Sequence, residues 1–400
     1  MDRTGKLAVL SVLSLFLPYF LCSVMIISCI IYSYGKKDLR VRMFQDKSWV
    51  LLGGFFFVSL FSALIFRNSF GILGAIIILL EISYLLFMRA IMTQKLYKLI
   101  IKLICAGSVV STFVGIVQFT IIRTGNTYPF WEMFEKLKEF PFIYDGMYKA
   151  SQYFKSLSIP HTSFRSISTF LNANYFAMIA SFVIIICIYK LTAKAQKHRL
   201  FYIIVLISNL ISLVIADSRS GIISVIAGTI MILIFRKKYR ALKIIGGVAV
   251  LGGALVVGSY LLFPNNFPSM EELLTTMDKR LKIWNGVISI IPENLLIGKG
   301  FMSYFFSYQA GDVPQWAIHS HNLFLDCVIN FGIIGTGCFL AYISAQMIQI
   351  VKKIKSVKSD VWILMFGVAV VIFVAGLTDA AILGIETSLM AIVISTGKME

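Results

Sequence analysis

The stretch VWILMFGVAVVIFVAGL, residues 361–377, contains no charged side chain and no proline. A helix of about 20 mostly apolar residues crosses the hydrocarbon core of a bilayer and satisfies its own backbone hydrogen bonds there. The stretch therefore predicts a transmembrane helix. Because similar runs follow one another along the chain, without the alternating pattern of barrel strands, we expect an all-α, polytopic integral membrane protein.

The composition of the whole chain also indicates that a bilayer is its solvent. Of the 400 residues, 58% are hydrophobic and 14% are charged, whereas a soluble domain is about 45–50% apolar. Pro18 lies within the first apolar run and kinks or breaks a helix, so that run is one long helix or two short ones and the chain has eleven or twelve spans. Residues 1–400 are expected to form a single transmembrane domain, with spans at approximately 7–34, 48–66, 71–88, 99–122, 170–189, 200–216, 221–235, 242–263, 321–350, 361–377 and 380–396.

The basic excess of the chain indicates topology rather than nucleic-acid binding. The formal net charge is +18, but the charges lie between the apolar runs. One alternate set of connections carries 22 Lys and Arg against 3 acidic residues, and the other carries 10 against 9. Because cytoplasmic loops hold the excess of Lys and Arg, the first set is predicted to face the cytoplasm. The two long loops, 123–169 and 264–320, then face outside, and loops of this length usually have a function.

The second outer loop contains a predicted amphipathic helix at about 270–291. Apolar residues recur there with a helical period up to Pro292, so we expect the helix on or near the membrane surface. At about 100° per residue, Arg280 projects from the apolar stripe between Met277 and Trp284. A charge in that position needs a partner.

Three arginines map to the outer ends of different predicted helices. Arg165, Arg219 and Arg280 suit a diphosphate, because guanidinium groups stay charged and bind phosphate oxygens in a bidentate manner. Arg165 and Arg219 precede predicted spans, where free backbone N–H groups and the helix dipole also favour an anion. Each single arginine has a structural interpretation as well, as an interfacial side chain or an ion-pair partner.

His321 is the candidate general base. It begins a predicted span, where the helix dipole disfavours a protonated ring, and a neutral imidazole can accept the proton of a sugar hydroxyl. A histidine at a helix start is also often a cap or a hydrogen-bond partner. His319 lies two residues earlier, which is not the spacing of a helical metal pair, so no metal site is expected. Asp326 points about 140° away from His321 around the helix, and Asp379 is interpreted as a residue of a tight outer turn.

These residues form a pattern that resembles a known family. His321-Asn322, followed after nine residues by Gly332-Ile333-Ile334-Gly335, resembles the signature of the O-antigen ligase and polysaccharide polymerase family of bacterial membrane proteins. The segment Asp217-Ser218-Arg219-Ser220-Gly221 resembles the Ser-Arg-Ser-Gly element of that family. The resemblance covers about residues 160–340, and its outer-loop element comprises Arg280, Trp284, Pro292, Gly298 and Gly300.

The resemblance implies a helical fold of the lipid-dependent, GT-C-like glycosyltransferase type and an undecaprenyl-diphosphate-linked sugar donor. It implies a catalytic His321 and diphosphate-binding Arg219 and Arg280, to which Arg165 is added as the arginine before the fifth span. His319 and Asn322, on either side of His321, are assigned to substrate binding. No metal, nucleotide or other cofactor is expected. The second histidine, His319, leaves open which of the two rings acts.

We therefore predict a metal-independent polymerase that joins repeat units of a surface polysaccharide such as O-antigen, capsule or exopolysaccharide. The nearest alternative is a ligase that transfers finished glycan to a lipid A core or another acceptor. A flippase for lipid-linked oligosaccharide is the alternative from another class, although transporters place their polar sites near mid-membrane. The expected location is the bacterial cytoplasmic (inner) membrane, with the active site on the extracytoplasmic side. Expected partners are undecaprenyl-diphosphate-linked oligosaccharide and membrane lipid, with a chain-length regulator and a flippase as further candidates.

Overall fold

The protein is helical throughout its described part. The computed structural model describes residues 2–17, 19–45, 47–123, 165–170, 172–193, 198–244, 246–247, 270–306, 319–356 and 360–397, and these ranges contain no strand. The helices are α1 (Arg3–Ser14), α2 (Tyr19–Gly35), α3 (Lys37–Phe44), α4 (Trp49–Ile65), α5 (Ser69–Ile91), α6 (Gln94–Arg123), α9 (Ala173–Leu191), α10 (Arg199–Ile215), α11 (Arg219–Phe235), α13 (Met270–Ile290), α14 (Ser303–Phe306), α15 (Leu323–Ser356), α16 (Val361–Gly376) and α17 (Ile385–Ser395). Short 3₁₀ turns follow α13 at Ile291–Asn294 and precede α17 at Ala381–Leu383.

The predicted all-α, polytopic membrane architecture is confirmed. Four helices, α5, α6, α9 and α15, are long and apolar enough to cross a membrane, and α3 with α4 would make a fifth across an 89° bend. Shorter apolar helices of 10–17 residues coincide with other predicted spans. Most of the span predicted at 242–263 and most of the outer loop 123–169 lie outside the described residues, as do 264–269 and 307–318 of the second outer loop, so the total of eleven or twelve stays a prediction.

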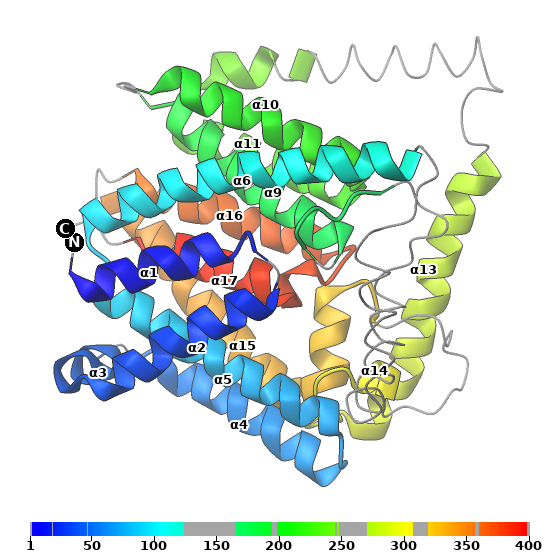
Figure 1. The fold of residues 1–400 in the computed structure, drawn as a ribbon. Coiled ribbons are helices and arrows are strands. Elements are labelled where there is room, and N and C mark those ends of the chain that lie inside the picture. The colour runs from blue at the N-terminus through cyan, green and yellow to red at the C-terminus, as the bar shows by residue number, and fades with distance from the viewer. Residues whose placement is uncertain are drawn as a thin grey trace.

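The first apolar run is divided into two helices. α1 ends at Ser14 and α2 begins at Tyr19, on either side of the proline whose missing N–H predicts the break. In Figure 1, α1 runs away from the end of the bundle at which α3 lies, and α2 returns to it. The beginning of α1 therefore lies at the same end of the bundle as α3, as expected when the first run is divided into two antiparallel helices.

The centre of the bundle is α9, which packs against α6, α10, α11, α16 and α17. Every residue from Phe176 to Cys187 is buried, as expected for a helix that is apolar all round. Large apolar side chains on outer helices are exposed instead, among them Phe57 on α4 and Val214 on α10. Such side chains suit a surface that faces lipid.

A break within α15 decides how the outer elements are placed. Gly332 has φ 61° and ψ −173°, a conformation that is essentially restricted to glycine. The loop after α13 occupies the break: Ile333 N–H donates to Leu295 O at 2.8 Å, and Ile334 N–H donates to Leu296 O at 3.1 Å. The break thus exchanges hydrogen bonds within the helix for hydrogen bonds to the loop.

The same loop is fixed from α4 and α5. Asn68 Nδ2 donates to Lys299 O at 3.0 Å and to Phe301 O at 3.1 Å, and Ser62 Oγ donates to Gly298 O at 2.7 Å. Because buried backbone carbonyls need such partners, these contacts fix the path of the loop. They also fix the end of α13, from which the loop leaves.

α13 lies across one end of the bundle, at a steep angle to the long helices (Figure 1). Its buried face carries Ile283, Val287 and Ile290, which pack with Tyr304 and with Ile329 of α15. Two further apolar residues of the same helix, Leu281 and Ile288, are 45% and 54% exposed. The helix therefore has a second apolar face that points away from α15, because the stripe is wider than the contact.

Replacing Gly332 by Ala tests the break. An added Cβ would lie 2.3 Å from the backbone of Leu296, so we expect the free energy of unfolding to fall by about 2 kcal/mol or more, measured as a lower melting temperature in detergent. Gly337→Ala is the matched control in the same helix, because nothing lies within 4 Å of its Cβ. Equal melting temperatures for the two variants would contradict the role assigned to the break.

Candidate active site

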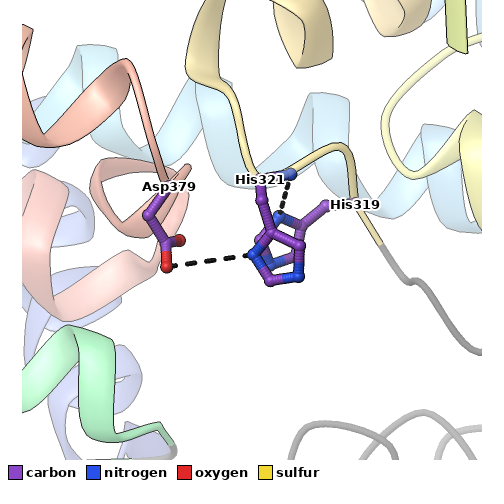
Figure 2. A group of neighbouring side chains, drawn as sticks. All are labelled: His319, His321 and Asp379. Atoms are coloured by element: carbon purple, nitrogen blue, oxygen red, sulfur yellow. Dashed lines mark hydrogen bonds and ion pairs between the residues drawn. The ribbon is translucent and has the colours of Figure 1, made fainter. Parts of the chain in front are cut away.

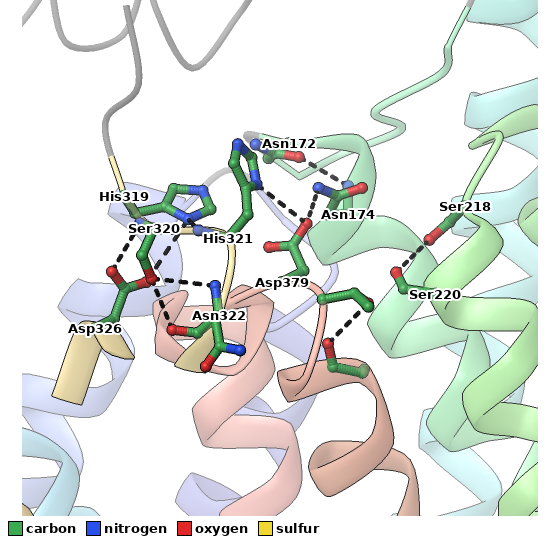
Figure 3. Close-up of polar contacts among 12 residues, drawn as sticks. Asn172, Asn174, Ser218, Ser220, His319, Ser320, His321, Asn322, Asp326 and Asp379 are labelled. Atoms are coloured by element: carbon green, nitrogen blue, oxygen red, sulfur yellow. Dashed lines mark hydrogen bonds and ion pairs between the residues drawn. The ribbon is translucent and has the colours of Figure 1, made fainter. Parts of the chain in front are cut away.

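Polar side chains from several helix ends converge at the end of the bundle where α13 lies. The start of α9, the α10–α11 turn, the segment before α15 and the α16–α17 turn each contribute residues, and Figure 3 shows them side by side. None of these segments is adjacent to another in the sequence. The packing of the helices is therefore what assembles the site.

The segment His319-Ser320-His321-Asn322 leads into α15 and is held on three sides. Ser320 N–H donates to Asp326 Oδ1 at 2.8 Å, and Trp284 Nε1 of α13 donates to Ser320 O at 2.9 Å. Asn322 Oδ1 caps α15 by accepting from the backbone N–H groups of residues 324 and 325, and its Nδ2 donates to Leu377 O at 3.1 Å. Since its side chain has these structural partners, the substrate-binding role of Asn322 stays a prediction.

The His321 ring faces an acidic residue from another helix end. Its Nδ1 lies 4.0 Å from Asp379 Oδ2, and the side chain keeps 31% of its surface exposed (Figure 2). Nδ1 is buried and has no hydrogen-bond partner among the described residues. A carboxylate in this place favours the tautomer with a proton on Nδ1, which leaves Nε2 free to accept a proton.

Asp379 is in turn held by a chain of hydrogen bonds that ends at Arg165. Asn174 Nδ2 donates to Asp379 Oδ2 (Figure 3), and one Nη of Arg165 donates to Asn174 Oδ1. Arg165 Nε donates to Ala216 O of the α10–α11 turn at 2.8 Å. The predicted Arg165 thus reaches His321 indirectly, through Asn174 and Asp379.

The electrostatic surroundings keep the His321 ring neutral. Burial lowers its pKa from 6.5 to about 4, and the neighbouring His319 ring and the charge of Arg280 act in the same direction. Asp379 and Asp326 oppose the shift by stabilising the protonated ring. A histidine with a lowered pKa is unprotonated at neutral pH and can therefore serve as a base.

Arg280 belongs to the same site. It lies on α13 one turn before Trp284 and is half-buried, and its charge lowers the pKa of both His321 and Arg165. The face of α13 that packs against α15 is therefore the one that directs Arg280 towards the histidine. Its predicted partner would be an anion, and no carboxylate among the described residues forms an ion pair with it.

Arg219 is placed differently. It is the first residue of α11, is exposed, and follows Ser218, whose Oγ caps the helix by accepting from Gly221 N–H at 3.2 Å. No contact between described residues joins it to His321. The free backbone N–H groups of the α11 terminus lie beside it, so its predicted part in diphosphate binding remains open.

His319 lies against His321, with ring centroids 4.2 Å apart. Together with Asp379 the two histidines offer three ligand atoms within 4.8 Å of one another, a set that could hold a metal ion. Two of the possible ligand atoms already have partners, because His319 Nδ1 accepts from His321 N–H and Asp379 Oδ2 accepts from Asn174. The expected absence of a metal stays a prediction.

Comparison with known families gives one match. Residues 203–340 match the family model described as O-antigen ligase. This part of the chain is therefore similar to the O-antigen ligase family. This finding confirms the resemblance drawn from the sequence motifs and supports a role as a polysaccharide ligase or polymerase in a bacterial membrane. No curated protein matches the chain.

The range that matches the family model contains only part of the site. Its matched range includes Arg219, Arg280 and His321 but not Arg165, Asn174 or Asp379. Sequence reasoning missed Asn174 altogether and interpreted Asp379 only as a turn residue. The available signals were an Asn-Ala-Asn triplet at 172–174, at the outer end of a predicted span, and an isolated acidic residue in an otherwise apolar region.

The charges around His321 predict its pKa, which can be measured in the purified protein without a substrate. In ¹⁵N-histidine NMR spectra of the purified protein, we expect His321 to stay neutral down to about pH 5 and to titrate at about pH 4. Asp379→Asn should lower this pKa further, because the carboxylate that stabilises the protonated ring is lost, and Arg280→Gln should raise it. Lys279→Gln, an equal charge change at an exposed neighbour, is the control. Titration near 6.5 would contradict the described burial.

Proposed function

We propose that this protein is a glycosyltransferase that polymerises repeat units of a surface polysaccharide on the outer face of the bacterial cytoplasmic membrane. The donor is a growing glycan linked to undecaprenyl diphosphate, and the acceptor is a sugar hydroxyl of the next lipid-linked unit. The observation that carries the proposal is the geometry of His321, whose Nδ1 lies 4.0 Å from Asp379 Oδ2 and whose ring lies within electrostatic range of Arg280. A base close to an arginine that has no ion-pair partner among the described residues suits the transfer of a sugar from a diphosphate.

The reaction needs one proton transfer and one displacement. His321 Nε2 accepts the proton of the acceptor hydroxyl as its oxygen attacks the anomeric carbon of the donor sugar. The bond from that carbon to the diphosphate oxygen breaks, and the electron pair leaves with the lipid diphosphate. Asp379 stabilises the imidazolium that forms, as the carboxylate does in other His–Asp pairs.

The arginines divide into two roles in this proposal. Arg280 has no anionic partner among the described residues, and Arg219 is exposed beside a helix N-terminus, so both suit the leaving diphosphate. Arg165 donates from Nε and one Nη to Ala216 and Asn174. It therefore acts mainly by holding Asn174, and through it Asp379.

A ligase is the second candidate, because the matched family model is described as O-antigen ligase. Ligation uses the same donor chemistry and differs in the acceptor, which is then a lipid A core or another glycolipid. A flippase is disfavoured because transporters place their polar sites near mid-membrane. The polar residues around His321 lie instead at the ends of the helices (Figure 3). The experiment must therefore compare these two kinds of acceptor.

Purified protein in nanodiscs, given lipid-diphosphate-linked repeat units, should produce a ladder of polymers on a gel without added nucleotide, and EDTA should not abolish it. His321→Ala should reduce the rate by about 100-fold or more, since it removes the general base. Arg280→Gln should also slow the reaction strongly, whereas Lys279→Gln, its exposed neighbour on α13, should not. Each variant is first checked for an unchanged melting temperature.

The outcomes separate the candidates. Transfer only to an added core-lipid acceptor would make the protein a ligase. Full activity of folded His321→Ala would reject the proposed base, and movement of the lipid-linked glycan across liposomes without elongation would restore the flippase.

The dependence of the rate on pH follows from the same base. Only the neutral ring accepts a proton. We therefore expect kcat/KM to be constant from about pH 8 to pH 5 and to fall as the pH drops through the His321 pKa of about 4. In Asp379→Asn the residual activity should begin to fall at a lower pH, since the pKa of His321 is then lower. A fall in wild-type kcat/KM centred near pH 6.5 would argue against His321 as the base.

A further inference from the structure

The backbone of His321 is strained, so contacts with neighbouring residues must stabilise its conformation. Its φ is 53°, in the left-handed region that is unfavourable for a residue with a side chain. The hydroxyl of the neighbouring Ser320 bonds to the backbone N–H and C=O of Asn322, and the Asn322 side chain caps α15. These contacts shape the loop but leave the N–H of His321 to another partner.

That partner is His319. His321 N–H donates to His319 Nδ1 at 3.1 Å, and Figure 2 shows the bond running from the backbone of one histidine to the ring of the other. An imidazole nitrogen accepts only with its lone pair, so Nδ1 of His319 must be unprotonated and its proton must be on Nε2. Burial, which lowers the pKa of His319, favours this neutral form.

Asp326 secures the loop from the α15 side. One of its carboxylate oxygens accepts from Ser320 N–H at 2.8 Å, whereas the other, 3.7 Å from His319 Nδ1, is beyond hydrogen-bond distance and leaves that nitrogen to the N–H of His321. The bond from Trp284 to Ser320 O holds the opposite side of the same peptide segment. His319 is therefore confined between α13, α15 and the ring of His321.

We propose that His319 is a positioning residue, whose Nδ1 holds the N–H of His321 in the left-handed conformation from which the His321 ring reaches both Asp379 and the substrate. The inference rests on the proposed function, in which His321 is the base, and it assigns the two rings different tasks. His321 touches the reacting hydroxyl, and His319 acts through the backbone of His321.

Two substitutions separate this role from direct catalysis. Asn places its side-chain oxygen where His carries Nδ1, whereas Gln places its oxygen near the position of Nε2. We expect His319→Asn to keep kcat within about threefold of wild type, and His319→Gln and His319→Ala to lose about 100-fold in kcat with little change in KM, because the base is misplaced while binding is kept. His198→Asn, at an exposed position before α10, is the matched control.

If folded His319→Asn is as inactive as His319→Gln, the ring itself is required and the inference is wrong. Full activity of all three His319 variants would also overturn it. His321→Ala in the same assay tests the proposed function separately, since it removes the base and leaves the acceptor at position 319 unchanged.

A second measurement tests the inference even if no activity is found. The chain has only four histidines, so ¹⁵N-histidine NMR can assign their tautomers with single His→Asn variants. The wild-type spectrum should show His319 with an unprotonated Nδ1 at neutral pH. A proton on Nδ1 of His319 would exclude the hydrogen bond from His321 and with it the proposal.

Discussion

The docking of the 295–300 loop into the break of α15 is the contact on which the rest of the site depends. Gly332 opens the helix, and the loop replaces the missing helical hydrogen bonds with its own carbonyls. The loop continues α13, which carries Arg280, and α15 begins just after His321. One contact between backbones therefore sets the distance between the arginine and the base. Gly335 permits the close approach of α4 behind it, where a Cβ would lie 3.1 Å from Val58.

The remainder of the site is built from helix ends that only the complete bundle brings together. Asp379 ends up beside His321 because α16 packs along α9 and α11, and Asn174 at the start of α9 then reaches its carboxylate. Asp379, Asn174 and Arg165 are buried or half-buried, and each is matched by a donor or an acceptor, which is what makes a polar network tolerable in an apolar bundle. Arg165 completes the chain by neutralising the acid from behind.

The sequence was sufficient for the helices and for the motif residues, because both follow from local patterns. Apolar runs predict spans, the Pro18 break follows from a missing N–H, and the position of Arg280 follows from a helical period. The Asn174–Asp379 pair could not be predicted, since it joins residues 205 positions apart through packing. A helical period likewise shows which residues of α13 are apolar, but it does not show which part of a wide apolar stripe packs against α15. The left-handed backbone of His321 has only a weak signal in its residue type, because histidine is enriched at positive φ.

The dependence of the site on helix ends has a mechanical consequence. A bilayer that is thicker or thinner than the hydrophobic length of the helices makes them tilt, at a cost of fractions of a kcal/mol per Å of mismatch. Tilting moves helix ends more than helix centres, and here the ends of α9, α15 and α16 carry the residues that must stay within hydrogen-bond reach. The thickness of the bilayer is thus mechanically coupled to the geometry around His321. A change in acyl-chain length would therefore alter the distances within the site even though no lipid contacts its residues.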